Sequence, residues 1–260
     1  MTYLKTTHTR RTLLLPLLVA SAGLLCGCPI TQTQDTPARH FSERAPASGM
    51  TYCIYVPSNY TSETAWPLVI TLHGTFPWDV AEFQIREWKA LAEKRGFIVV
   101  APKCGSLSTQ GILPVSQSWR LSDLAEDAQG ILDVLETVSR KYNIKRNRVL
   151  LTGFSSGGYP MYYTGLRNPE TFHAMVARAC NFERAVVDDA ELTPQTRRIP
   201  TMIFVGKDDP ALQGDSWAAY RWLHRHGWNK HSAKRKETDG GHLRRPETAY
   251  NYWVNYFGGG

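Results

Sequence analysis

Several features that mark specialised proteins are missing from this sequence of 260 residues. No spacing of Cys and His resembles a metal site, so we expect no bound metal. The apolar run near the start, residues 13–25, is too short for a comfortable transmembrane helix. Internal repeats and a second linker are also missing, so a single globular domain is expected over residues 49–260.

Acidic residues are too few to balance the basic ones. The 30 Lys and Arg residues outnumber the 23 Asp and Glu residues, which leaves a formal net charge of +7. The basic residues are scattered, and the densest run, residues 234–236, is short. No nucleic-acid-binding motif accompanies them, so we interpret them as a solvated basic face and expect no nucleic-acid partner. Hydrophobic residues make up 42% of the chain, enough to bury a sizeable core.

The first 27 residues have the pattern of an export signal. Basic residues at positions 5, 10 and 11 precede the apolar run, and small residues follow it. Residues 9–14, TRRTLL, faintly resemble a twin-arginine signal, so the export route stays open. We therefore expect a signal peptide over residues 1–27 and an exported protein.

The end of this signal resembles a bacterial lipobox. In LCGC, residues 25–28, Leu25 lies three positions before Cys28 and the small Gly27 lies directly before it. The resemblance implies cleavage before Cys28, a diacylglyceryl group on its sulfur and a membrane anchor in the cell envelope. Cys26 is the alternative site, and a simply cleaved signal with incidental cysteines is the alternative interpretation.

The next segment, residues 28–48, is rich in Thr, Gln, Pro and Ala and poor in large apolar residues, so we expect a flexible tether. Downstream, Cys53, Cys104 and Cys180 form an odd set that allows at most one disulfide. Cys104 and Cys180 both follow predicted strands, so a pair between them stays open.

From about residue 50 onward, predicted strands and helices alternate. Strands are expected at 50–57, 67–74, 97–104, 148–153, 173–180, 200–206 and, as a polar edge strand, 231–238. Helices are expected at 80–96, 121–142, 156–169, 216–227 and 246–257. In the first helix Phe83, Trp88 and Leu91 lie on one stripe, and Ser122 is expected to cap the second. The pattern predicts an α/β fold with a mostly parallel sheet and helices on both faces, where functional residues gather at the carboxyl ends of strands.

The string GFSSGG, residues 153–158, lies between a predicted strand and a predicted helix. It matches G-x-S-x-G in one register, with Ser155 as the central serine. A nucleophile on a sharp strand-to-helix turn needs small neighbours, and Gly153 and Gly157 supply them. If Ser156 were the nucleophile, Phe154 would occupy a position that requires glycine. The motif therefore favours Ser155.

A serine nucleophile needs a base and an acid to activate it. In proteins with this motif on a strand-to-helix turn, the acid and then the histidine follow the serine along the chain. The strand at 200–206 leads directly to Asp208 and Asp209, and His242 follows two glycines in a later loop. Asp209 is the preferred acid, and Asp208 remains an alternative. Three further histidines, His224, His226 and His231, are weaker candidates because they lie on a helix or at the start of a polar strand.

Two backbone N–H groups are also needed to stabilise the oxyanion of an acyl-transfer reaction. The N–H of Ser156 is expected to be one of them, because this residue follows the nucleophile. The other is expected from Thr75, in the turn that Gly74 permits after the strand at 67–74. His73 could be mistaken for a base, but we expect it to brace the backbone of this turn.

Together these motifs resemble the α/β-hydrolase serine esterases, and more narrowly the polyhydroxybutyrate depolymerase and feruloyl or acetylxylan esterase group. The resemblance spans about residues 50–257. It is carried by LHGT (72–75), FIVVAP (97–102), RVLLTGFSSGG (148–158), GKDDP (206–210) and GGH (240–242). It implies an acyl-enzyme mechanism in which Ser155 attacks an ester, His242 transfers the proton and Asp209 orients His242. No cofactor is implied.

Two departures limit the resemblance. The doubled aspartate at 208–209 blurs the choice of acid, and residues 105–120 match no pattern of that group. This segment is expected to shape the substrate pocket, with Trp119 either lining the pocket or packing in the core. The substrate class stays open among small esters, acylated polysaccharides and polyesters. Alternative functions are a prolyl-oligopeptidase-like peptidase and a non-catalytic envelope-binding lipoprotein.

Overall fold

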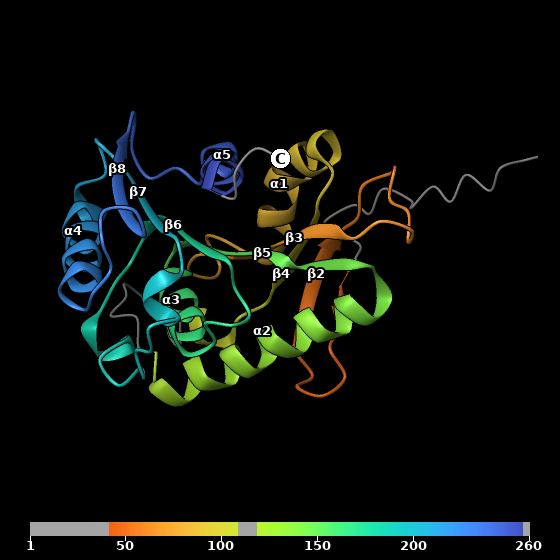
Figure 1. The fold of residues 1–260 in the computed structure, drawn as a ribbon, viewed down its shortest axis with the longest axis horizontal. Coiled ribbons are helices and arrows are strands. Elements are labelled where there is room, and N and C mark those ends of the chain that lie inside the picture. Colours follow the sequence, from red (N-terminus) through yellow and green to blue (C-terminus); the bar gives the residue numbers. More distant parts are fainter. Residues whose placement is uncertain (1–41, 109–118, 257–260) are drawn as a thin grey trace, which may run out of the picture. The chain divides into compact units, whose positions relative to one another are not determined.

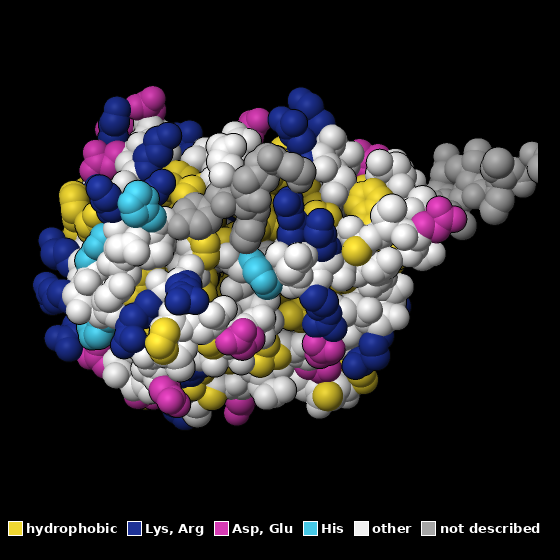
Figure 2. All heavy atoms as spheres, in the orientation of Figure 1, with side chains coloured by type: hydrophobic (Ala, Val, Ile, Leu, Met, Phe, Trp, Pro, Cys, Tyr) yellow, Lys and Arg dark blue, Asp and Glu magenta, His cyan; other side chains and the backbone are white. Residues whose placement is uncertain are grey.

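The computed structural model describes residues 42–108 and 119–256. The expected signal peptide, the lipidation candidate Cys28 and most of the expected tether lie outside these residues. Within the described residues, no helix has both the length and the apolar character needed to span a membrane. On the face drawn in Figure 2, Lys and Arg side chains are dispersed among acidic and uncharged residues rather than gathered in one patch.

The described residues form a mostly parallel sheet, as the sequence predicts (Figure 1). The strands from β3 to β8 run parallel, whereas β2 pairs antiparallel with both β1 and β4. The central strands are buried apolar runs, as expected for a parallel sheet covered on both faces. In spatial order, the strands are β1 (Glu43–Arg44), β2 (Thr51–Tyr55), β4 (Ile98–Pro102), β3 (Trp66–Leu72), β5 (Ile144–Ser155), β6 (Ala174–Cys180), β7 (Thr201–Gly206) and β8 (Ala233–Thr238).

Helices cover both faces of this sheet (Figure 1). One core cluster joins the sheet to α2 (Leu121–Lys141), α3 (Gly158–Arg167) and α4 (Pro210–Arg225). A second cluster, on the other face, joins it to α1 (Ala81–Arg95) and α5 (Pro246–Tyr256). In the described part of the chain, short 3-10 helices lie at Gly105–Leu107, Arg184–Val186 and Thr196–Arg198.

Residues 43–48, expected to belong to the tether, are part of this fold. β1 pairs with β2, and Ala45 is fully buried. The backbone N–H and the hydroxyl of Ser48 donate hydrogen bonds of 2.7 and 2.8 Å to the carboxylate of Asp133. The domain therefore begins earlier than the polar composition of this segment predicts, because pairing with β2 and hydrogen bonds to Asp133 satisfy its polar groups.

Two details of the expected helices are wrong. In α1 the buried face contains Ile85, Trp88 and Ala92, whereas Phe83 is 36% exposed, so the stripe expected to include Phe83 is rotated. α2 begins at Leu121, so Ser122 is inside the helix rather than at its cap. There the carboxylate of Asp123 accepts a hydrogen bond from the backbone N–H of Arg120, which satisfies a donor at the helix start.

Candidate active site

Ser155 lies at the sharp turn between β5 and α3. Its φ of 54° falls in the left-handed region, which is uncommon for a residue other than glycine. The neighbouring glycines permit this turn because a Cβ at Gly153 would lie 2.4 Å from the carbonyl oxygen of Gly157. A Cβ at Gly157 would in turn lie 2.5 Å from the carbonyl oxygen of His73. The strand, the turn and the helix therefore approach more closely than any larger residue would allow, as G-x-S-x-G predicts.

The turn after β3 lies against this serine. β3 and β5 are neighbours in the sheet, with Leu72 paired to Gly153, so the two strands end side by side. A Cβ at Gly74 would lie 3.1 Å from the Cβ of Ser155. The hydroxyl of Thr75 donates a hydrogen bond of 2.9 Å to the hydroxyl of the fully buried Ser156. Across the described part of the chain, the backbone N–H groups of Thr75 and Ser156 have no hydrogen-bond acceptor.

Asp209 and His242 meet at the ends of β7 and β8. The ring Nδ1 of His242 lies 2.7 Å from Oδ2 of Asp209. Asp209 is 4% exposed and lies directly before α4, whereas Asp208 faces solvent. Gly206 allows the two loops to approach, because a Cβ there would lie 2.2 Å from the carbonyl oxygen of Gly241. Of the two adjacent aspartates, Asp209 is therefore the one that contacts the histidine.

The His242 ring packs against the residue that precedes Ser155. Its centroid lies 4.6 Å from the centroid of the Phe154 ring. The side chain of His242 is 39% exposed, so one edge of the imidazole is open to solvent. Among the described residues, the side chain of Ser155 forms no hydrogen bond within normal distance, to His242 or to any other group. The structure thus brings His242 beside the serine turn without a direct hydrogen bond.

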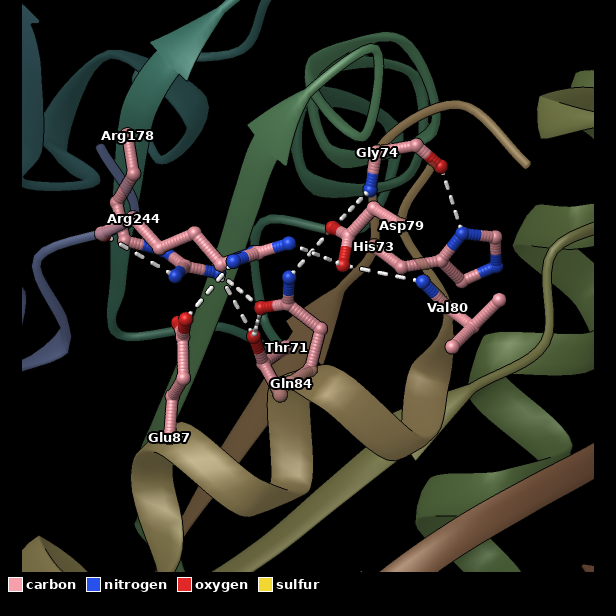
Figure 3. Close-up of polar contacts among 9 residues, drawn as sticks. All are labelled: Thr71, His73, Gly74, Asp79, Val80, Gln84, Glu87, Arg178 and Arg244. Carbon is pink, nitrogen blue, oxygen red and sulfur yellow. Dashed lines mark hydrogen bonds and ion pairs between the residues drawn. The ribbon is translucent and has the colours of Figure 1, made fainter. Parts of the chain in front are cut away.

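His73 is buried and holds backbone groups, as expected for a structural residue (Figure 3). Its Nδ1 lies 2.7 Å from the carbonyl oxygen of Gly74, and its Nε2 accepts the backbone N–H of Cys104 at 3.2 Å. These two contacts define a neutral ring with the proton on Nδ1. Burial lowers the pKa of His73 below its usual value, which also favours the neutral form.

The competing histidines lie away from Asp209. His224 is in the last turn of α4 and His226 follows it, whereas Asp209 precedes the first turn. At 1.5 Å per residue, this helix separates its two ends by roughly 24 Å. His231 is exposed in the loop before β8. In the described residues, His242 is the histidine that contacts Asp209.

Trp119 and the cysteines flank the site. Trp119 is half-buried and lies against Tyr159 in the first turn of α3, with ring centroids 5.4 Å apart. Cys53, Cys104 and Cys180 are all buried free thiols, so the disulfide that the sequence left open is not formed. No three His, Cys, Asp or Glu side chains gather as metal ligands among the described residues.

Sequence reasoning missed a polar cluster beside the Gly74 turn. The residues are Asp79 in the following loop, Gln84 on α1, Arg178 on β6 and Arg244 in the loop after His242 (Figure 3). One signal was available, since Arg178 is a charged residue inside an otherwise apolar strand. Arg244 is one of the scattered basic residues, and no local pattern marks it.

Known proteins with similar sequences are esterases. A bifunctional acetylxylan esterase/xylanase of Neocallimastix patriciarum is 30% identical over 122 residues, which cover 46% of this chain and 16% of that protein. Feruloyl esterase B of Neurospora crassa is 28% identical over 138 residues, which cover 48% of this chain and 44% of that protein. The chain thus spans less than half the length of these curated relatives.

The fold is shared with solved esterase structures. A CE1 ferulic acid esterase from Anaeromyces mucronatus, solved in complex with ferulic acid, matches with a TM-score of 0.65 and 17% identity, covering 84% of this chain and 89% of that chain. This likeness identifies the α/β-hydrolase fold. The family model named Esterase, described as "Putative esterase", matches residues 44–253, which is most of the chain. The protein therefore belongs to this Esterase family and has the α/β-hydrolase fold.

Proposed function

We propose that the protein is a serine hydrolase that cleaves carboxylic esters, with Ser155 as nucleophile, His242 as general base and Asp209 as the orienting acid. The contact of 2.7 Å between His242 Nδ1 and Asp209 Oδ2, beside the strained turn that presents Ser155, carries this proposal. A buried carboxylate on Nδ1 keeps the proton there and leaves Nε2 as the basic nitrogen. Membership of the Esterase family supports the same reaction class.

In the proposed reaction, Ser155 Oγ attacks the ester carbonyl carbon while His242 Nε2 takes its proton. The tetrahedral intermediate collapses when the imidazolium returns this proton to the departing alcohol, which leaves an acyl group on Ser155. A water molecule then attacks the acyl carbon while His242 takes its proton. The imidazolium returns a proton to Ser155 Oγ as the bond to the acyl group breaks, which releases the acid and restores the serine. Catalytic hydrogen bonds are often long in free enzymes and shorten in the complex with substrate. These reaction steps therefore do not require a hydrogen bond between Ser155 and His242 in the free protein.

The N–H groups of Thr75 and Ser156 are the proposed oxyanion donors. Both are without an acceptor among the described residues, and the hydroxyl bond between their side chains holds their turns together. Donors fixed before the reaction stabilise the developing negative charge without reorganisation, and the loss of one typically costs roughly 3–4 kcal/mol.

We further propose acylated polysaccharides as the substrate class. Relatives with the names acetylxylan esterase and feruloyl esterase support this choice over polyesters and other small esters. A panel of acetylated xylan, a feruloylated arabinoxylan fragment, a polyhydroxybutyrate film and an aminoacyl-proline peptide would test it. Faster hydrolysis of the polyester or of the peptide than of both glycan esters would contradict the proposed class.

The test of the reaction separates the two adjacent serines. Ser155→Ala should lower p-nitrophenyl acetate hydrolysis by roughly 10⁶-fold, to the background rate, because the nucleophile is lost. A fluorophosphonate probe should label Ser155, which peptide mass spectrometry can distinguish from Ser156. The matched variant Ser156→Ala keeps the nucleophile and should still be labelled. Hydrolysis at the wild-type rate by folded Ser155→Ala would refute the proposal.

Export and anchoring are proposed from the sequence alone. The lipobox-like LCGC predicts a diacylglyceryl group on Cys28, which would hold the enzyme at the cell envelope. Detergent phase partitioning of the protein expressed with its full sequence should place it in the detergent phase. Cys28→Ser should move it to the aqueous phase, and Cys26→Ser should not. Detergent partitioning of Cys28→Ser would contradict Cys28 as the anchor.

A further inference from the structure

Two arginines outside the proposed triad link the loops that carry it. Arg244 lies two residues after His242 and forms ion pairs with Asp79 at 3.0 Å and with Glu87 at 2.8 Å (Figure 3). Its guanidinium also lies 5.0 Å from the centroid of the Phe154 ring, next to Ser155. The side chain of Arg244 therefore extends from the His242 loop towards Asp79 and towards the turn of Phe154 and Ser155.

Asp79 connects this arginine to the oxyanion turn. Its Oδ1 accepts Arg244, while its Oδ2 accepts the backbone N–H of Gly74 at 2.6 Å and the amide of Gln84 at 2.7 Å. Asp79 is 3% exposed, so these charge-assisted bonds are shielded from water. Because the Gly74 N–H is directed to Asp79, this carboxylate sets the orientation of the turn that presents the next residue, Thr75.

Arg178 closes the network into a ring. It is 1% exposed and donates to Gln84 Oε1 at 2.8 Å and to the backbone carbonyl oxygen of Arg244 at 3.2 Å. It also donates to the hydroxyl of Thr152 on the adjacent strand β5 and to that of Thr71 on β3, one strand further along the sheet. Burial lowers the pKa of Arg178 to about 10, so it remains charged at neutral pH.

The ring constrains the backbone at Arg244 and Arg245, which has an unfavourable conformation. Arg245, directly after Arg244, has a φ of 44°, a left-handed conformation that is unfavourable for a non-glycine residue. Such a conformation persists only where the surroundings fix it. The bonds from Arg178 to the Arg244 carbonyl and from Arg244 to Asp79 provide that constraint.

We infer that Arg244 and Asp79 are positioning residues that set the placement of His242 relative to the Gly74–Thr75 turn, through a closed ring completed by Gln84 and Arg178. The inference rests on the proposed function. Neither residue takes part in the chemistry, so their loss should misplace the reacting groups. A misplacement of about 1 Å lowers turnover by roughly 100-fold.

The experiment measures kcat and KM for p-nitrophenyl acetate, the rate of fluorophosphonate labelling and the thermal unfolding midpoint of the full chain. Arg244→Gln and Asp79→Asn should each lower kcat and the labelling rate by roughly 10- to 100-fold in folded protein, with KM nearly unchanged. Arg244→Lys, which keeps the charge, should recover part of the loss. The double variant should be no slower than the slower single variant, because both changes break one link.

Two further variants sharpen the result. Glu87→Gln removes the second carboxylate that pairs with Arg244. Glu87 lies on α1 and belongs neither to the His242 loop nor to the Gly74–Thr75 turn, so this variant should lower kcat less than Asp79→Asn does. Arg146→Gln removes an exposed arginine pair with Glu136 and should match wild type. Any of three results would overturn the inference. The first is a wild-type kcat in folded Arg244→Gln and Asp79→Asn, and the second is a pair of kcat losses that multiply in the double variant. The third is a loss of kcat that only follows the folded fraction. Ser155→Ala, run in parallel, separates these outcomes from failure of the proposed function, since an active Ser155→Ala protein would refute the triad itself.

Discussion

The hydroxyl of Thr75 donates a hydrogen bond of 2.9 Å to the hydroxyl of Ser156, and so joins the turn after β3 to the turn after β5. The two backbone N–H groups proposed as oxyanion donors belong to these same residues. Ser156 is fully buried, so its hydroxyl has no water to replace a lost partner. The bond therefore fixes the spacing of the two donors.

Replacing this hydroxyl tests that spacing. Thr75→Val keeps the branched shape and the backbone N–H but leaves the Ser156 hydroxyl without its donor. We expect kcat for p-nitrophenyl acetate to fall about 10-fold, less than the roughly 100-fold loss expected from removing an oxyanion donor itself. Thr75→Ser retains the hydroxyl and should stay near wild type. Equal kcat values for the two variants would show that the hydroxyl bond has no part in catalysis.

The adjacent aspartates give a second prediction. Asp209→Asn keeps the size of the side chain that touches His242 but changes the charge and the favoured tautomer, so kcat should fall by about 10⁴-fold. Asp208→Asn alters an exposed carboxylate and should have little effect. Steady-state kinetics of both variants, with circular dichroism to confirm folding, would check this contrast. A larger loss in Asp208→Asn would reverse the assignment of the acid.

A third prediction concerns close packing at the serine turn. Gly157 has a φ of −58°, which any residue can adopt, so only the lack of space requires glycine there. A Cβ would meet the carbonyl oxygens of His73, Leu72 and Phe154 at 2.5, 2.8 and 2.9 Å. Gly157→Ala should therefore destabilise the fold by about 1–3 kcal/mol and reduce activity, as measured by urea unfolding and ester hydrolysis.

Gly214 provides the matched control for this substitution. It lies inside α4, and a Cβ there would have no heavy atom within 4 Å. Gly214→Ala should stabilise the protein by about 1 kcal/mol, because alanine favours the helix and loses less backbone entropy. If both variants were destabilised equally, contact at the turn would not explain the requirement for Gly157.

Much of the fold was predictable because its signals are local. The apolar runs of β3, β4 and β7 and the G-x-S-x-G turn can each be identified within a few neighbouring residues. The composition of residues 43–48 predicts a tether, whereas their order comes from pairing with β2 and from hydrogen bonds to Asp133, which is distant in sequence. Local composition cannot report such contacts.

The candidate site shows the same division. Ser155, Asp209 and His242 could be proposed because each follows a predicted strand in the order that the fold requires. The ring of Arg178, Gln84, Asp79 and Arg244 could not, because its members come from three parts of the chain, at residues 79–84, 178 and 244, that only the packed structure brings together. An arginine within an apolar strand indicates a buried polar network but does not identify its partners.

The last prediction concerns acid stability and His73. Burial is the main cause that lowers the pKa of His73 below 6.5, with Lys103 acting in the same direction, while the bond to Gly74 and the charges of Asp79 and Glu82 oppose it. Below about pH 6.5 the imidazole takes up a proton in the unfolded chain but not in the folded protein. The free energy of unfolding should therefore fall as the pH drops below this value, and should level off only below the folded-state pKa.

His73→Gln removes this titration and isolates its share of the acid sensitivity. The variant should be less stable than wild type at about pH 8, because the contacts to Gly74 and Cys104 are disturbed. Between about pH 8 and about pH 5 it should lose less stability than wild type, by up to about 1.4 kcal/mol for each pH unit between the two pKa values. Urea unfolding at both pH values would measure this difference, with His231→Gln, at an exposed imidazole, as the control. An identical pH dependence in wild type and His73→Gln would show that the buried His73 ring does not contribute, since a neutral ring that resists protonation must link folding to pH in this direction.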